Sequence, residues 1–149
     1  MNIYTELIAE QGSMVFSIQG NSMEPLLREG DSVRIFNMTS LKPGDCYIFK
    51  LNGKMIIHRL AGKIGEDYYF IGDNSNSFEK VTREQIYGHL YGNPNKKMEK
   101  HLIMIINWLY LHFMRRRPPF RAFGLRKRII RTIFRSIHEK TIPETPDLY

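Results

Sequence analysis

The sequence predicts a mainly β domain with a short helix before it and a helical, basic extension after it. Up to residue 97, short apolar stretches alternate with polar residues at a period of two and are separated by turn residues, which is typical of β-strands. After residue 97 the sequence changes to a long apolar segment and then to arginines mixed with apolar residues. We therefore predict a β domain over residues 1–97 and an extension over residues 98–149, with a disordered end at residues 141–149.

The elements of the β domain are predicted from spacing and turn residues. Residues 2–10 have apolar residues at helical spacing and are followed by Gly12, which predicts a short helix. Alternation then predicts strands over residues 13–19, 32–36, 46–51, 55–60, 68–71 and 87–91, with a short helical turn over residues 82–86. The turns between strands are marked by Gly-Asp pairs at 30–31, 44–45 and 72–73, and by Asn52-Gly53.

The positive charge of the chain is confined to the extension. The 149 residues have a formal net charge of +7, yet residues 1–114 carry 12 Lys and Arg against 12 Asp and Glu, whereas residues 115–149 carry 10 against 3. This distribution favours a neutral domain with a basic appendage over a domain with a basic surface throughout. The single cysteine, Cys46, excludes an internal disulfide framework and a multi-cysteine metal site. We expect neither a metal nor an organic cofactor.

Ser22 is the first candidate functional residue. It follows Gly20 at the end of an apolar strand and precedes a turn that contains Pro25, a position from which a strand can present a side chain to a cleft. A serine hydroxyl is a weak nucleophile at neutral pH unless a base within hydrogen-bond distance removes its proton. Taken alone, Ser22 also fits a helix cap before Glu24-Pro25, and Met23 and Pro25 fit simple packing.

His58 is the candidate base for that serine. It lies in the apolar run of residues 55–60, where strand alternation places it on the same face as Ile56 and places Arg59 on the other. Taken alone, His58 also fits a hydrogen-bonded histidine of the core. Lys54, beside a predicted turn, is an alternative base.

The motifs around these residues resemble the superfamily of type I signal peptidases and self-cleaving LexA-type repressor domains. Its nucleophile motif, Gly-x-Ser-Met-x-Pro followed by Gly-Asp, matches residues 20–31; a second Gly-Asp pair matches 44–45, and a Gly-Asp-Asn motif matches 72–74. The base is lysine in bacterial signal peptidases and repressors, but histidine followed by arginine in the endoplasmic-reticulum-like and archaeal branch, which this chain is similar to. The resemblance covers about residues 13–92 and implies the signal-peptidase/LexA-like β-ribbon fold.

The resemblance also implies a role for each matching residue. Ser22 would be the nucleophile, with its backbone N–H as one oxyanion donor, and His58 would act as general base and then general acid. Asp73 would orient the imidazole, although Gly-Asp-Asn is also ordinary turn chemistry and Glu79 is the alternative acid of the histidine branch. Gly20, Met23 and Pro25 would shape the nucleophile turn. Gly20 departs from the members that have a second, hydroxyl oxyanion donor at that position.

The extension predicts a membrane-surface contact. Residues 101–114 are mainly apolar but shorter than the roughly 20 residues of a spanning helix, and a basic amphipathic helix follows. This order is typical of binding to an anionic membrane surface. The residues expected to bind the membrane are Arg115, Arg116, Arg117, Arg126, Lys127, Arg128, Arg131 and Arg135. Alternatively, residues 101–114 dock on the domain and the charges are solvated; nucleic acid is disfavoured because the helix lacks an aromatic stacking platform.

Together these features predict a serine endopeptidase that hydrolyses a peptide or precursor protein through an acyl-enzyme. Because residues 1–12 lack the charged and apolar regions of a signal peptide, we expect a cytoplasmic protein, peripheral at the inner face of the membrane. Two alternatives stay open. One is a non-catalytic membrane-binding or partner-binding module on the same scaffold, and the other is a self-cleaving regulator.

Overall fold

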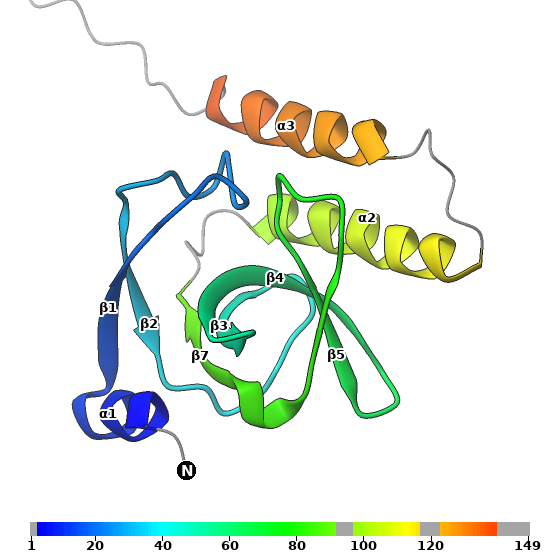
Figure 1. Cartoon of the computed structure of the whole chain (residues 1–149). Coiled ribbons are helices and arrows are strands. Elements are labelled where there is room, and N and C mark those ends of the chain that lie inside the picture. The colour runs from blue at the N-terminus through cyan, green and yellow to red at the C-terminus, as the bar shows by residue number, and fades with distance from the viewer. Residues whose placement is uncertain (1–2, 92–96, 117–122, 140–149) are drawn as a thin grey trace, which may run out of the picture.

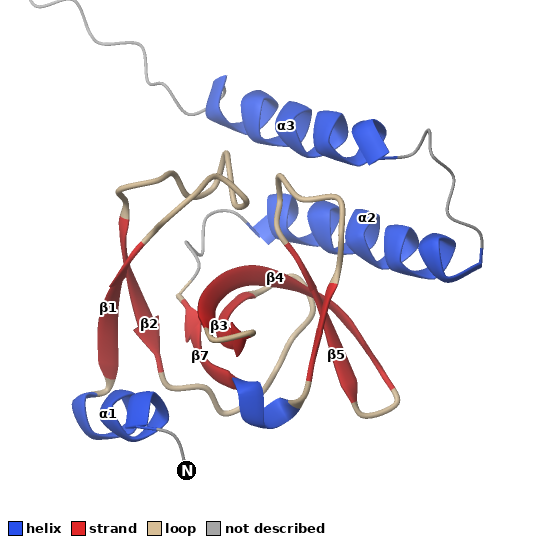
Figure 2. Ribbon diagram, viewed as in Figure 1, coloured by secondary structure: helices blue, strands red, loops and turns tan. Residues whose placement is uncertain are grey.

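The computed structural model describes residues 3–91, 97–116 and 123–139, in which a curled antiparallel sheet is accompanied by helices (Figures 1 and 2). The predicted mainly β fold is confirmed. The elements are α1 (Ile3–Gln11), β1 (Ser13–Ser17), β2 (Ser32–Phe36), β3 (Cys46–Leu51), β4 (Lys54–Ile64), β5 (Asp67–Ile71), β6 (Glu79–Val81), the 3-10 turn η1 (Arg83–Gln85), β7 (Ile86–Leu90), α2 (Lys97–Arg116) and α3 (Phe123–Glu139). The disordered end expected at residues 141–149 lies outside the described residues.

The seven strands of the described chain follow the order β1-β2-β7-β3-β4-β5-β6, and each neighbouring pair is antiparallel. β4 is longer than predicted because the register shifts between Leu60 and Gly62, so the strand bends and continues to Ile64. This bend curls the sheet. β6, at Glu79–Val81, was not predicted because three residues are too few to show alternation.

The core lies on both faces of β3. Cys46 and Ile48 join a cluster with Ile8 of α1 and Met23 of the segment after β1, whereas the alternate residues of β3 join a second cluster. That second cluster consists of Tyr47, Phe49, Leu60, Phe70, Val81 and Ile86. Because successive residues of a strand point to opposite faces, a strand buried on both sides must be apolar throughout, as β3 is over its first four residues.

α2 packs onto the sheet and α3 packs onto α2, so neither helix stands apart from the domain. Tyr110 and Leu111 of α2 are buried with Ala61 and Ile71 of the sheet, and Lys100 forms an ion pair with Asp45. A separate apolar cluster, Ile103, Ile130 and Phe134, joins α3 to α2. Figure 1 shows both helices on the side of the molecule away from α1. One face of residues 101–114 therefore docks on the domain, and among the described helices none is long and apolar enough to cross a bilayer.

Candidate active site

Ser22 lies in a turn that is anchored at both ends. The backbone of Ile18 bonds to Asp31 through its N–H at 2.8 Å and accepts from Gly30 at 3.0 Å, which closes the segment. Within this segment, Met23 is buried in the core, and its carbonyl accepts from the backbone N–H groups of Leu26 and Leu27. Because the residue after the serine is fixed in the core, Ser22 is held at the surface of the sheet with its side chain half-buried.

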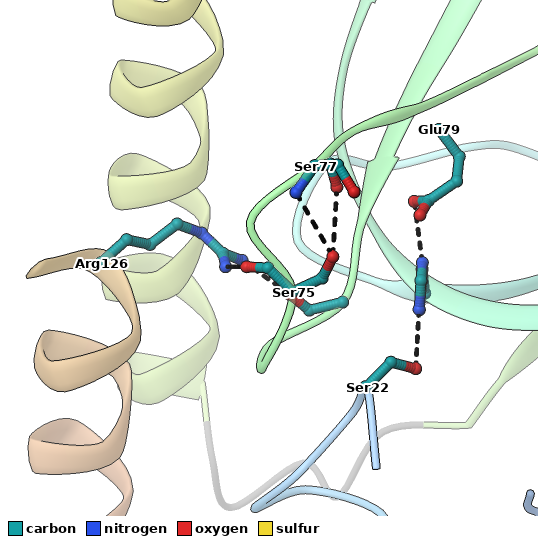
Figure 3. Close-up of polar contacts among 7 residues, drawn as sticks. Ser22, Ser75, Ser77, Glu79 and Arg126 are labelled. Atoms are coloured by element: carbon teal, nitrogen blue, oxygen red, sulfur yellow. Dashed lines mark hydrogen bonds and ion pairs between the residues drawn. The ribbon is translucent and has the colours of Figure 1, made fainter. Parts of the chain in front are cut away.

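His58 of β4 connects the serine to a carboxylate. Its Nε2 lies 2.9 Å from Ser22 Oγ and its Nδ1 lies 2.8 Å from Glu79 Oε2, while the imidazole is only 5% exposed (Figure 3). A carboxylate accepts only, so Nδ1 carries the proton toward Glu79 and Nε2 is left to accept from the serine hydroxyl. The ring edge also packs against Phe49, which restricts its rotation.

Asp73 contacts the residue that follows the histidine. Its Oδ1 accepts from Arg59 Nε at 2.9 Å and its Oδ2 from Arg59 Nη2 at 2.7 Å, and the carboxylate is 1% exposed. Arg59 Nη1 also donates to the Gly44 carbonyl at 2.7 Å. The predicted Asp73–His58 contact is therefore not the one formed, because strand alternation sends His58 and Arg59 to opposite faces. Glu79, the alternative acid, holds the position beside the imidazole.

The segment Gly72–Ser75 touches both the serine and the histidine. The Asn74 N–H donates to the Ser22 carbonyl at 2.8 Å, and its side-chain amide donates to the Asn21 carbonyl at 3.1 Å. A β-carbon placed on Gly72 would lie 2.5 Å from the Ser22 carbonyl oxygen and 2.8 Å from His58 Nε2. Only glycine allows this approach, which explains the glycine of the Gly-Asp-Asn motif in physical terms.

A cleft of about 560 Å³ opens at Ser22. Its lining residues are Phe16, Ser17, Ile18, Gln19, Gly20, Ser22, Met23, Ile48, Lys54, Met55, Ile56 and Ile57. Two strand segments thus form its walls: β1 with the residues after it, and the start of β4. Gly20, with a φ of +78°, turns the chain from the first wall into the nucleophile turn, and Pro25 lies half-buried beyond it. Lys54 reaches the cleft but has no contact with Ser22 among those observed.

The described residues offer neither a reactive thiol nor a metal-holding cluster beside the serine. Burial raises the pKa of the Cys46 thiol to about 12, so the thiolate is scarce at neutral pH. No group of three or more His, Cys, Asp or Glu side chains in this part of the chain is arranged to hold a metal ion. The arrangement can deprotonate a serine hydroxyl next to a peptide-sized cleft.

A protein-family model described as Peptidase S24-like matches residues 2–90. The chain belongs to the Peptidase S24-like family. A search of curated proteins found no match. The family supports serine peptidase or self-cleaving chemistry, and the matched range contains Ser22, His58 and Glu79 while ending before α2.

One basic residue outside the S24-like range, Arg126, lies where the membrane prediction does not place it. Arg126 is 3% exposed and its guanidinium points inward, so the prediction that Arg126 binds the membrane is wrong. Arg128, Arg131 and Arg135 are exposed and Lys127 is half-buried. The side chains of Arg115 and Arg116, and the whole of Arg117, lie outside what the structure describes.

The contact of Arg126 with the S24-like domain was missed by sequence reasoning. Arg126 precedes Ile130 by four residues and Phe134 by eight, so it falls on the apolar stripe of α3. An arginine on an apolar stripe is the signal that marks a buried cation. The sequence analysis placed Arg126 on the surface instead, because arginine is rarely fully buried.

Proposed function

We propose that the protein is a serine endopeptidase that cleaves a peptide or precursor protein through an acyl-enzyme on Ser22. The observation that carries the proposal is the line of three side chains, Ser22, His58 and Glu79, joined at 2.9 and 2.8 Å. His58 followed by Arg59 supports a place in the histidine-base branch of the superfamily.

In the proposed reaction, Ser22 Oγ attacks the scissile carbonyl carbon while His58 Nε2 takes the hydroxyl proton. Glu79 stabilises the imidazolium and keeps the ring in its tautomer, and the Ser22 N–H is one donor to the oxyanion. His58 then protonates the leaving amine, which departs and leaves the acyl-enzyme. Water deprotonated by His58 hydrolyses the ester and restores Ser22.

The cleft supports an extended peptide as substrate. β1 lies at the edge of the described sheet and forms one wall, so its backbone groups can pair with an added strand. The other wall is largely apolar, with Met55 and Ile57. Small residues next to the cleaved bond are part of the proposal, because the superfamily that the chain resembles usually presents an extended substrate strand to shallow pockets.

The test is mass spectrometry of a peptide library incubated with the wild-type chain, Ser22→Ala or His58→Ala. We expect both variants to lose cleavage by at least about 10³-fold, because nucleophile and base act as a unit. The matched controls Ser136→Ala and His112→Ala change exposed residues of the same types and should cleave normally. Cleavage that persists in Ser22→Ala would overturn the proposal.

The same experiment separates the two alternatives. A self-cleaving regulator would show fragments of its own chain, formed by the wild type and not by Ser22→Ala. A wild-type chain that cleaves neither the library nor itself would favour the non-catalytic binding module.

We also propose that α2 and α3 place the protein at an anionic membrane surface on the cytoplasmic side. The support is an exposed apolar row on one face of α2, Leu102, Ile105, Leu109 and Phe113, with Trp108 beside it. Exposed Arg128, Arg131 and Arg135 of α3 add positive charge, at about 1 kcal/mol each near anionic lipid.

Co-sedimentation of the full chain with vesicles tests this second proposal. We expect binding to vesicles that contain phosphatidylserine and not to phosphatidylcholine alone, with weakening as salt rises from about 0.05 to 0.5 M. Leu109→Gln with Phe113→Gln should abolish binding and Arg128→Gln should weaken it, whereas Lys63→Gln on β4 serves as the charge control. Absence of lipid binding, or binding to DNA in its place, would contradict the proposal.

A further inference from the structure

The guanidinium of Arg126 is bonded to the backbone of the segment that touches the active site. Its Nη1 donates to the Ser75 carbonyl at 2.8 Å (Figure 3). Its Nη2 donates to the Gly72 carbonyl at 3.1 Å, and its Nε donates to Asn107 Oδ1 at 2.9 Å. The Tyr110 ring lies 5.7 Å from the guanidinium, and its hydroxyl donates to the Asn76 carbonyl at 3.2 Å. α2 and α3, which follow the matched family range, therefore both form hydrogen bonds with residues 72–76.

The opposite side of that segment meets the candidate active site. Asn74 donates to the Ser22 carbonyl, and Gly72 lies against Ser22 and the His58 ring. Glu79 begins β6 two residues after Ser77, so the carboxylate beside the imidazole follows directly from the same segment. Residues 72–75 thus lie between α3 on one side, through Arg126 and through a 3.2 Å bond from Arg131 Nη2 to Asn74 Oδ1, and the reacting groups on the other.

A buried arginine at this point of α3 needs a reason, because an apolar side chain would continue the stripe of Ile130 and Phe134 without desolvating a cation. Burial lowers the pKa of Arg126 to about 10, while the nearby Asp73 carboxylate acts in the opposite direction, so the group is a cation at neutral pH. The two backbone carbonyls and the Asn107 oxygen are the acceptors that account for it. Asn107 is itself fully buried on α2, which fixes the direction of the guanidinium fork.

We propose that Arg126 is a positioning residue: it holds the Gly72–Ser75 segment against Ser22 and His58, so that the α2–α3 hairpin completes the active site of the S24-like domain. This inference rests on the proposed peptidase function. Among the described residues, no observed hydrogen bond joins Arg126 to a residue that lines the cleft. Loss of Arg126 should therefore lower kcat and leave KM nearly unchanged.

The test compares Arg126→Met, Arg126→Lys and the exposed control Arg83→Met in the full chain. With a peptide taken from the library, we expect Arg126→Met to lower kcat by about 10²-fold, since small misplacements of reacting groups have effects of that size. Arg126→Lys keeps the charge but not the fork, so it should lie between Arg126→Met and the wild type. Arg83→Met should match the wild type.

Amide hydrogen exchange provides a readout that needs no substrate. In Arg126→Met, the Asn74 amide, which bonds to Ser22, should exchange faster, whereas the Leu60 amide, which bonds to Asp45 in the sheet, should be unchanged. Unchanged kcat with unchanged Asn74 exchange would overturn the proposal. So would equal acceleration at Asn74 and Leu60, because it would mean that the whole fold is loosened.

The two proposals fail separately. If the wild-type chain cleaves nothing, the peptidase function fails. Selective acceleration at Asn74 would then still show that Arg126 holds the segment, whereas unaltered exchange would overturn that as well.

Discussion

At the residue scale, His58 and Arg59 are neighbours in the chain with opposite partners. His58 faces Ser22 and Glu79, and Arg59 faces Asp73 and the Gly44 carbonyl. The two carboxylates therefore have different physical surroundings. Glu79 is partly exposed and touches the imidazole, whereas Asp73 is fully buried and neutralises a buried guanidinium.

Exchanging each carboxylate for its amide should separate these roles. Glu79→Gln should lower kcat by about 10²–10⁴-fold with little loss of stability, because an amide can impose the wrong tautomer on His58. Asp73→Asn should lower the free energy of unfolding by about 3–5 kcal/mol, because it removes the carboxylate to which Arg59 Nε and Nη2 donate in a buried site. Peptide cleavage and urea unfolding measure the two effects.

Full activity in Glu79→Gln, together with an inactive Asp73→Asn of unchanged stability, would contradict this assignment. Asp73 would then be the residue that orients His58.

Sequence reasoning found the serine and the histidine but could not choose between the acids. Ser22 and His58 sit in local motifs whose spacing is visible in the chain. The position of Glu79 depends on β6 pairing with β5, where Glu79 lies opposite Phe70. That long-range register leaves no local pattern, because β6 is only three residues long.

At the element scale, the segment Gly72–Ser75 has no regular structure, yet it has contacts on both sides. Ser75 N–H bonds to the Gly72 carbonyl at 3.0 Å, which closes a tight turn between the serine and α3. Gly72, the first residue of this turn, is also the residue that lies against Ser22 and His58.

Gly72→Ala should therefore impair activity more than its small size suggests. The added carbon would lie 2.5 Å from the Ser22 carbonyl oxygen, so the nucleophile turn or the segment must shift. We expect kcat to fall by about 10²-fold and stability by about 1–3 kcal/mol, measured by peptide cleavage and thermal unfolding. The matched control is Gly62→Ala, where the nearest atom, Leu111 Cδ2, is at an ordinary 3.5 Å. Wild-type kcat in Gly72→Ala would contradict this account of the contact.

The strands were predictable where alternation is regular and less so where it is interrupted. β2 and β3 were predicted at their observed bounds because their alternation is regular or their apolar run is bounded by turns. β4 was predicted to end at residue 60, whereas the irregularity between Leu60 and Gly62 lets it continue to Ile64. A bulge reverses the side-chain alternation, so a search for period two ends there.

At the scale of the whole molecule, the packed core extends further along the chain than the family match does. The matched range ends at residue 90, while Tyr110 and Leu111 share a core cluster with Ala61 and Ile71. Composition suggested an appendage because it reports the charge of a segment. It does not report which face of a helix packs, and so Arg126 was assigned to the surface although its side chain is buried.

Because Arg126 is translated after the reacting residues, the active site of the proposed enzyme is completed in a fixed order during synthesis. Ser22, His58 and Glu79 are all translated before α3. Chains fold from the amino terminus as they emerge from the ribosome, at about 5–20 residues per second. With Arg126 as the positioning residue, a chain still attached to the ribosome has its reacting groups without the clamp that aligns them. Full activity would then be reached only after α3 has been made and has docked, so proteolysis stays slow until that helix is complete.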